Sequence, residues 1–324
     1  MHVLHITKAS YIRLVISTLV GVLVGIVFIR LNPYSEANLC DMMWAINAAR
    51  DLWAGRDPYR HTPSINLVPY PLTSAIIVFP IALFPSAIGL TILFGIVSAC
   101  LAYVLIRDGC YWRLVIFVSP AYFMALKSIQ WSPIFMLVLF FPFLAPVLLA
   151  KPTLAFPIAL LVRWSPIRLL TVILVGSVSF IVMPNWIWRW FSQTGVYDGF
   201  IPLFSWFGPL FFISILFWQN LSSRLFFLMM MMTPQHRFFY DQLILWLIPQ
   251  TRRQMLALTI SSWIGFYYIW LSFDTLWVDE TYLLATTYLP AFLIVLWQQP
   301  LLRQVTSRIL SVLVEKRTCK GLPE

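Results

Sequence analysis

Long apolar runs separated by short polar segments constrain this chain more than any other feature of its sequence. Five of them lie at 14–29, 86–106, 169–183, 255–273 and 283–297. A helix of about 20 apolar residues spans the hydrocarbon core of a bilayer. Hydrophobic residues make up 60% of the 324 residues and charged residues only 10%, whereas a soluble domain is about half apolar and a quarter charged. The sequence therefore predicts an integral membrane protein.

The predicted fold is all-α, because only helices and closed barrels satisfy their backbone in lipid and no alternating barrel strands occur in the sequence. A short apolar segment at 72–84 and a long apolar block at 134–162 contain prolines, which is typical of broken helices. We expect a polytopic protein of about ten to twelve transmembrane helices. Residues 1–300 form this domain, without a separate soluble domain, and residues 301–324 form a basic cytoplasmic tail.

The formal charge of +10 comes from basic residues scattered along the ends of the apolar segments. This pattern is typical of cytoplasmic loops that follow the positive-inside rule, and it argues against nucleic acid as a partner. We expect a multi-pass protein of the plasma membrane, with an uncleaved first span and with both termini in the cytoplasm. Trp186, Trp188 and Trp190 are then expected on the outer side, at the level of the lipid headgroups.

The longest polar stretch, residues 36–71, separates the first two apolar segments. Residues 40–54 within it have a helical pattern, with a broad apolar face and with Asp41, Arg50 and Asp51 on the polar side. Gly55 ends this helix, and Asp57-Pro58 begins a turn. The sequence predicts an amphipathic helix along the outer membrane surface, within an outer loop at 36–71.

Three polar clusters fall on the outer face under this topology. They are Asp41 with Arg56 and Asp57, Gln130 with Lys127 and Lys151, and His236 with Arg237, Tyr240 and Asp241. A carboxylate can accept a proton from a hydroxyl nucleophile. Lysine, arginine and protonated histidine stabilise the charge that grows on a phosphate leaving group. The combination indicates a reaction on a lipid-linked phosphate.

The order of these motifs resembles a known family. A first span, an outer loop with an early Asp41, the sequence Gly-Arg-Asp-Pro-Tyr at 55–59 and Tyr70-Pro71 before an apolar run are similar to the polyprenol-phosphate-mannose-dependent mannosyltransferases of the GT-C superfamily, glycosyltransferase family 87. Gln130, followed by an apolar block and Lys151-Pro152, resembles the family's Gly-Gln and Lys-Pro pattern. Ser128-Ile129 stands where that family has its glycine.

The resemblance implies a GT-C-like fold and a role for each matching residue. Asp41 would be the catalytic general base toward the acceptor hydroxyl, and the hexose, expected to be mannose, would be transferred with inversion. The other implied site residues bind the donor phosphate or the substrate, or shape the loop: Lys151, His236, Arg237, Arg56, Asp57, Tyr59, Gln130 and Tyr240. The implied partners are the lipid bilayer, a polyprenyl-phosphate sugar donor and a glycolipid or glycan acceptor.

Neither a cofactor nor a metal ion is expected. The sequence contains no Gly-x-x-x-x-Gly-Lys phosphate loop and no Asp-x-Asp pair. Two other functions stay open: a transporter or flippase for a lipid-linked or amphiphilic substrate, and an inactive GT-C-like protein.

Each site residue also has a purely structural alternative. Asp41 is placed to stabilise the start of a helix, and Asp57-Pro58 is a common turn. A lysine near a helix end can extend its ammonium group to the interface, although a charge inside an apolar block is by default functional. Lys151 is such a charge.

Overall fold

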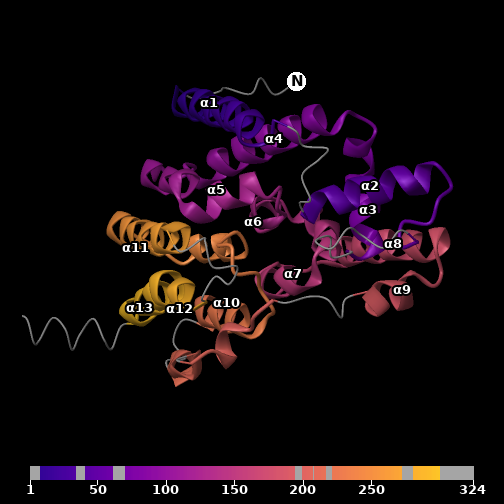
Figure 1. Ribbon diagram of the computed structural model, residues 1–324. Coiled ribbons are helices and arrows are strands. Elements are labelled where there is room, and N and C mark those ends of the chain that lie inside the picture. The colour runs from indigo at the N-terminus through magenta and orange to yellow at the C-terminus, as the bar shows by residue number, and fades with distance from the viewer. Residues whose placement is uncertain are drawn as a thin grey trace, which may run out of the picture.

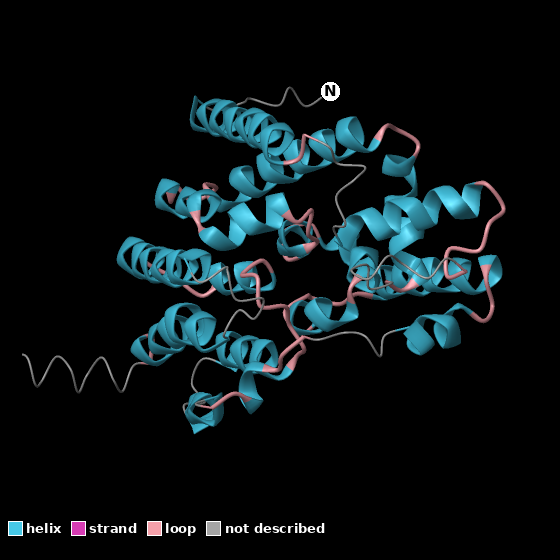
Figure 2. Cartoon of the chain, in the orientation of Figure 1, coloured by secondary structure: helices cyan, strands magenta, loops and turns pink. Residues whose placement is uncertain are grey.

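The computed structural model describes residues 8–33, 41–60, 70–193, 199–206, 208–216, 221–271 and 280–299 (Figure 1). Within these ranges the chain forms helices and no strand (Figure 2), and the only pairing of extended backbone is an isolated bridge between Phe200 and Gln235. The predicted all-α class is confirmed for this part of the chain. Glu36, the acidic segment around Asp274 and Asp279, and the basic tail at 301–324 lie outside the described residues.

Three described helical segments are long and apolar enough to cross a membrane. They are α1 (Lys8–Leu31), α4 (Ser86–Leu105) and the continuous segment Glu280–Trp297, which comprises α12 (Glu280–Leu283), the π-helical η8 (Leu284–Tyr288) and α13 (Leu289–Trp297). A fourth is possible if α8 (Pro166–Val182) and α9 (Trp186–Gln193), which meet at 88°, count as one broken span. These helices have the composition of a membrane protein. The expected ten to twelve crossings stay a prediction.

Short helices occupy the middle of the chain, as the prolines there predict. They are η1 (Tyr111–Val118), α5 (Pro120–Lys127), α6 (Ser132–Val138), η2 (Pro142–Ala150) and α7 (Pro152–Ala159). Pro120, Pro142 and Pro152 each stand in the first turn of a helix, where the missing N–H has no partner to lose. Pro146 and Pro157 lie inside helices and interrupt their hydrogen bonding. The chain can therefore turn often within an apolar region.

The predicted amphipathic helix is α2 (Asp41–Trp53), which packs against the short apolar helix α3 (Leu72–Ala82). Arg50 of α2 donates hydrogen bonds to the carbonyls of Ala82 and Phe84 at 3.2 and 2.9 Å. These carbonyls lie at the end of α3, where no helical partner is available to them. Arg50 was expected on the polar side of the helix, and these hydrogen bonds connect α2 to α3.

The remaining described helices are η4 (Pro202–Phe204), η5 (Gly208–Leu216), α10 (Leu221–Met232), η7 (Asp241–Leu247) and α11 (Arg252–Leu271). α11 is the predicted span at 255–273. It is 20 residues long, but it is not among the described helices that are apolar enough to cross. α10 and α13 run in opposite directions, because Phe227 stacks on Phe292 while Tyr288 bonds to Gln235 further along the chain.

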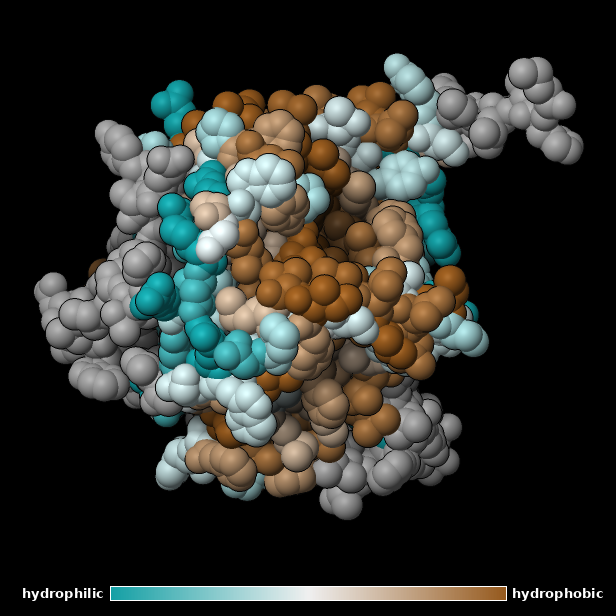
Figure 3. All heavy atoms as spheres, turned by 90° about the vertical axis from the view of Figure 1, so that its right-hand side faces the viewer, coloured by the Kyte–Doolittle hydropathy of each residue, from teal (hydrophilic) through white to brown (hydrophobic). Residues whose placement is uncertain are grey.

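The surface of the described chain is largely hydrophobic. Figure 3 shows the side on which α2, α8 and α9 lie in Figure 1, with brown hydrophobic side chains over much of it and teal hydrophilic ones gathered along one side. Leu174 and Ile181 on α8 are exposed, as are Ile92 and Ile96 on α4. α1 lies against α4 with Phe28 stacked on Phe94, and a Cβ at Gly21 would come within 2.6 Å of the Gly95 carbonyl. Close helix contact through glycine is typical of packing in lipid.

Candidate functional site

An ion pair between Lys151 and Asp241 lies inside the protein. Their Nζ and Oδ1 atoms are 2.9 Å apart, and the side chains are only 7% and 2% exposed. Lys151 also donates to Oε1 of Gln130 at 3.5 Å. Its ammonium group faces the rings of Tyr70 and Tyr240, at 5.9 and 5.3 Å from their centroids. The structure therefore brings together three predicted site residues, Lys151, Gln130 and Tyr240.

Amide and phenol groups extend this ion pair into a network. The second carboxylate oxygen of Asp241 accepts a hydrogen bond from the backbone N–H of His236 at 2.9 Å. Gln242 donates to Oε1 of Gln235 at 2.9 Å, and the Tyr288 hydroxyl contacts the same oxygen. We call Gln130, Lys151, Gln235, Asp241, Gln242 and Tyr288 the buried polar cluster. All six are buried, and such networks hold a fixed geometry only when they are well bonded.

The backbone is strained at two points beside the buried polar cluster. Ile129, directly before Gln130, has a φ of 51°, and Phe239, two residues before Asp241, has a φ of 65°. Among the described residues these are the only ones other than glycine with positive φ. A β-branched or bulky residue rarely takes this conformation, and such strain gathers at functional sites. Ile129 has the conformation that glycine adopts easily.

The first turn of α2 contacts the same point of the chain. The backbone N–H of Met42 donates to the carbonyl of Ile129 at 3.3 Å. The backbone of the predicted base, Asp41, is therefore one residue away from a contact with Ile129, which itself precedes Gln130. The side chain of Asp41 lies outside the described part of the structure.

The residues around His236 divide between two places. The His236 ring stacks on Phe238 with 5.1 Å between centroids, and it lies 5.5 Å from the ring of Tyr240. Arg237 instead forms an ion pair with Glu280 at 3.1 Å. His236 and Tyr240 thus belong next to the buried polar cluster, whereas the guanidinium of Arg237 is held by the start of α12.

Arg56, Asp57 and Tyr59 hold the Gly-Arg-Asp-Pro-Tyr loop together. Arg56 pairs with Asp51 of α2 at 2.7 Å, and Asp57 pairs with Arg189 of α9. Oδ1 of Asp57 accepts the backbone N–H of Tyr59 at 3.0 Å, as expected for a turn started by aspartate. The three side chains have the loop-shaping role, and their contact with a sugar stays a prediction.

Tyr59 connects this loop to the buried polar cluster. Its hydroxyl donates to the carbonyl of Tyr70 at 2.8 Å, and the Tyr70 ring faces Lys151. Burial raises the pKa of the Tyr59 phenol above its usual value, so the phenol stays protonated and remains a donor. The ring of Trp44 lies 5.4 Å from Tyr59 and 6.4 Å from Tyr70.

Replacing Tyr59 by phenylalanine tests this connection. The Tyr70 carbonyl would lose the hydrogen bond from the Tyr59 hydroxyl, and a buried hydrogen bond contributes about 0.5–1.5 kcal/mol to stability. We expect a lower thermal unfolding midpoint for Tyr59→Phe in detergent. Tyr111→Phe, on an exposed tyrosine, is the matched control and should unfold like the wild type. Equal midpoints for the two variants would contradict the structural role of the Tyr59 hydroxyl.

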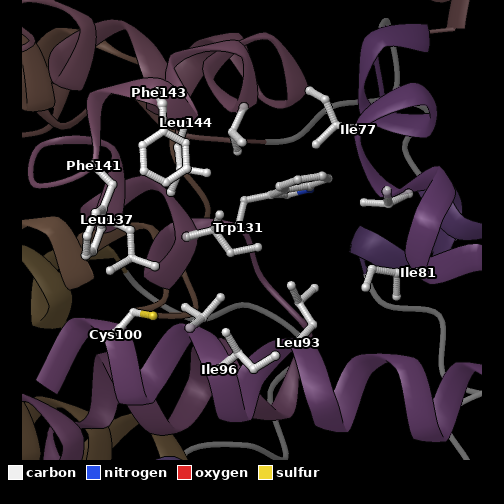
Figure 4. Close-up of a pocket in the computed structure, with 14 residues that line it drawn as sticks. Ile77, Ile81, Leu93, Ile96, Cys100, Trp131, Leu137, Phe141, Phe143 and Leu144 are labelled. Atoms are coloured by element: carbon white, nitrogen blue, oxygen red, sulfur yellow. The ribbon is translucent and has the colours of Figure 1, made fainter. Parts of the chain in front are cut away.

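An apolar cavity of about 360 Å³ lies between α3, α4, α6 and η2 (Figure 4). Aliphatic and aromatic side chains line it, among them Ile77, Leu93, Leu137 and Phe143. Trp131 also lines it, and its buried indole N–H has no hydrogen-bond partner within the described part of the chain. The volume is in the range of ligand sites, which are mostly apolar with a few polar groups. Because Trp131 follows Gln130, the cavity adjoins the buried polar cluster along the chain.

Sequence reasoning missed several residues of this site. Asp241 was grouped with His236 but not recognised as the partner of Lys151, and Gln235, Gln242 and Tyr288 were not singled out. The sequence feature that could have identified them is that they are polar residues within or beside apolar segments. Arg189 was not singled out either, because the tryptophans around it in the sequence are typical of a belt at the lipid headgroups.

Comparisons with known proteins give no match. No protein-family model matches this chain, and it matches neither a curated protein nor a solved structure. The function of the protein is therefore inferred from its own residues.

Proposed function

We propose that this protein is a membrane glycosyltransferase of the GT-C type, which moves a hexose, mannose in our proposal, from polyprenyl phosphate to a hydroxyl acceptor. One observation carries the proposal: the hydrogen bond from Met42 to Ile129 puts the start of α2, where Asp41 lies, beside Gln130 of the buried polar cluster. The backbone at the start of α2 and the polar side chains around Lys151 then lie in one region of the protein. The strained backbone at Ile129 and Phe239 supports a functional role for that site.

The proposed chemistry is a single displacement. The Asp41 carboxylate accepts the proton of the acceptor hydroxyl, while the oxygen of that hydroxyl forms a bond to C1 of the sugar. The bond between C1 and the phosphate oxygen breaks, and polyprenyl phosphate leaves with the electron pair. Lys151 and His236 stabilise the charge of that phosphate. Asp241 holds Lys151 in position through their ion pair.

The lipid part of the donor needs an apolar site close to the phosphate. The cavity beside Trp131 supports this assignment, because it is lined by apolar side chains and adjoins Gln130 (Figure 4). The indole N–H of Trp131 would then meet an oxygen near the polar end of the lipid. The acceptor, a glycolipid or glycan, would approach from the side of the Gly-Arg-Asp-Pro-Tyr loop.

The proposed location is the outer face of the plasma membrane, in a GT-C fold of ten to twelve crossings with both termini cytoplasmic. The right-angled turn between α8 and α9 supports a position of α9 at the membrane surface. If α8 crosses the bilayer, α9 lies along its surface, and the exposed Trp188 and Phe191 meet the headgroups. Arg189 of α9 then ties the loop of Asp57 to the membrane surface.

The ion pair of Lys151 and Asp241 favours a second candidate, a carrier for an amphiphilic substrate. Ionisable groups buried within membrane proteins often mark the path of a substrate or a proton. In that case the pair would open and close during transport, and no bond of the substrate would break.

A reconstitution experiment separates the two candidates. The purified full chain is placed in liposomes with mannosyl-phosphoryl-polyprenol labelled in the sugar, and a membrane extract supplies acceptors. A glycosyltransferase moves the label from the donor to an acceptor of the extract. If the donor stays intact and labelled lipid crosses the bilayer faster than in empty liposomes, the protein is a carrier and the proposed enzyme activity is wrong.

A further inference from the structure

Arg224, the fourth residue of α10, is buried, and no described residue is its counterion. The residue is 4% exposed, and none of its three guanidinium nitrogens has a hydrogen-bond partner in the described part of the structure. A guanidinium carries five N–H donors and is always protonated in proteins. A buried charge is normally paired, because water no longer solvates it. The guanidinium is therefore available to bind an anion, as far as the described residues go.

The described carboxylates of η7 and α12 already have partners. Asp241 pairs with Lys151 and accepts the His236 N–H, and Glu280 pairs with Arg237. Arg224 lies near the start of α10, whereas Gln235 of the buried polar cluster follows the other end of this helix. Arg224 is thus separate from the site proposed for sugar transfer.

The helix around Arg224 adds to the attraction for an anion. α10 is 12 residues long, and Arg224 is its fourth residue. The first N–H groups of a helix have no partner within it, and the helix dipole is positive there. Side chains in a helix lean back toward its N-terminus, so a side chain at this position is directed toward the helix start. Guanidinium and helix start together match the planar, multiply charged oxygens of a phosphate.

The surroundings favour a phosphate that is carried by a lipid. η5 packs against α10, and its Leu210, Phe212 and Ile213 are exposed apolar residues. The same end of the molecule includes the exposed Arg252 and Arg253, because α11 begins beside Gln298 at the end of α13. A basic border above an apolar surface is the arrangement that meets phospholipid headgroups.

We propose that Arg224 and the N-terminus of α10 form a binding site for a phosphate group, that of a membrane phospholipid, distinct from the sugar-transfer site. The lipid chains would lie along the apolar surface of η5. The guanidinium would bind the phosphate oxygens through paired N–H groups, which a lysine cannot reproduce.

The test uses the full chain in a maltoside detergent and a buffer without phosphate. Dioleoyl phosphatidylglycerol is titrated, with dioleoylglycerol as the same lipid without phosphate and inorganic phosphate as the free anion. Binding is followed by native mass spectrometry and by the thermal unfolding midpoint, which a ligand of the folded state raises. Wild type is compared with Arg224→Gln, Arg224→Lys and the control Arg163→Gln, which changes an exposed arginine between α7 and α8.

We expect phosphatidylglycerol to bind and stabilise the wild type and Arg163→Gln. Arg224→Gln should weaken binding by about tenfold or more, and Arg224→Lys should fall between them. Equal binding by Arg224→Gln and Arg163→Gln, or equal stabilisation of the wild type by dioleoylglycerol, would overturn the site. A shift with inorganic phosphate alone, equal to that with the lipid, would overturn the lipid as its source. If Arg224→Gln does not fold, Arg224→Lys and the wild-type lipid comparison decide the question.

Discussion

Lys151→Met is expected to destabilise the protein by about 3–5 kcal/mol, because it leaves the carboxylate of Asp241 buried without its cation. The backbone N–H of His236 also donates to this carboxylate, at 2.9 Å, but one N–H does not replace an ammonium group. The thermal unfolding midpoint of the purified protein in detergent measures the loss.

Two comparisons make this result specific. Arg56→Met removes an ion pair with Asp51 in which the arginine side chain is 61% exposed, and should cost less than about 1 kcal/mol. The double variant Lys151→Met with Asp241→Leu removes both charges, and should recover much of the stability, since apolar replacement of a buried pair is often neutral. A Lys151→Met protein as stable as Arg56→Met would show that the buried pair is not formed.

Asp41→Asn is expected to lower the rate of sugar transfer by more than about a hundredfold, because an amide cannot accept the proton of the acceptor hydroxyl. Folding should be preserved, since asparagine caps a helix as well as aspartate does. The measurement is the initial rate of label transfer at saturating donor, together with the thermal unfolding midpoint.

Asp51→Asn is the matched control for that variant. Asp51 lies on the same helix α2, and its partner is Arg56 at the surface, so its loss should leave the transfer rate close to that of the wild type. If Asp41→Asn transfers sugar as fast as Asp51→Asn, Asp41 is not the general base. Its role would then be the stabilisation of the start of α2.

Local sequence pattern predicted the helices well where the residues of a single segment determine the helix and its ends. The amphipathic helix expected at 40–54 is α2 at Asp41–Trp53, and the apolar run at 86–106 is α4 at Ser86–Leu105. Gly55, with a φ of 69°, ends α2 as predicted. In the region of short helices, prolines mark the first turns. Periodicity, caps and prolines are local, so they can be read from the sequence.

The partners of charged residues could not be predicted in the same way. The charge of Lys151 in an apolar block indicates that some partner exists, but Asp241 is 90 positions away in the chain. Arg237 was expected beside the donor phosphate, and it pairs with Glu280, because the start of α12 lies next to it. Asp57 and Arg189 are 132 positions apart. Such pairs depend on how the helices pack, which no local pattern contains.

The strained residues show a further limit of sequence reasoning. Ile129 stands where the resemblance leads one to expect glycine, and its sequence alone argues against a left-handed backbone there. The structure has this conformation nonetheless, with a φ of 51°. Packing of the buried polar cluster therefore overrides the local preference of isoleucine.

The configuration of the transferred sugar tests the central claim most directly. The wild type in liposomes is given donor of known anomeric configuration, and the product is analysed by nuclear magnetic resonance or by anomer-specific glycosidases. A single displacement with Asp41 as base predicts that the hexose reaches the acceptor with its configuration inverted. Retention of configuration, or a donor that keeps its sugar through the whole incubation, would contradict the account.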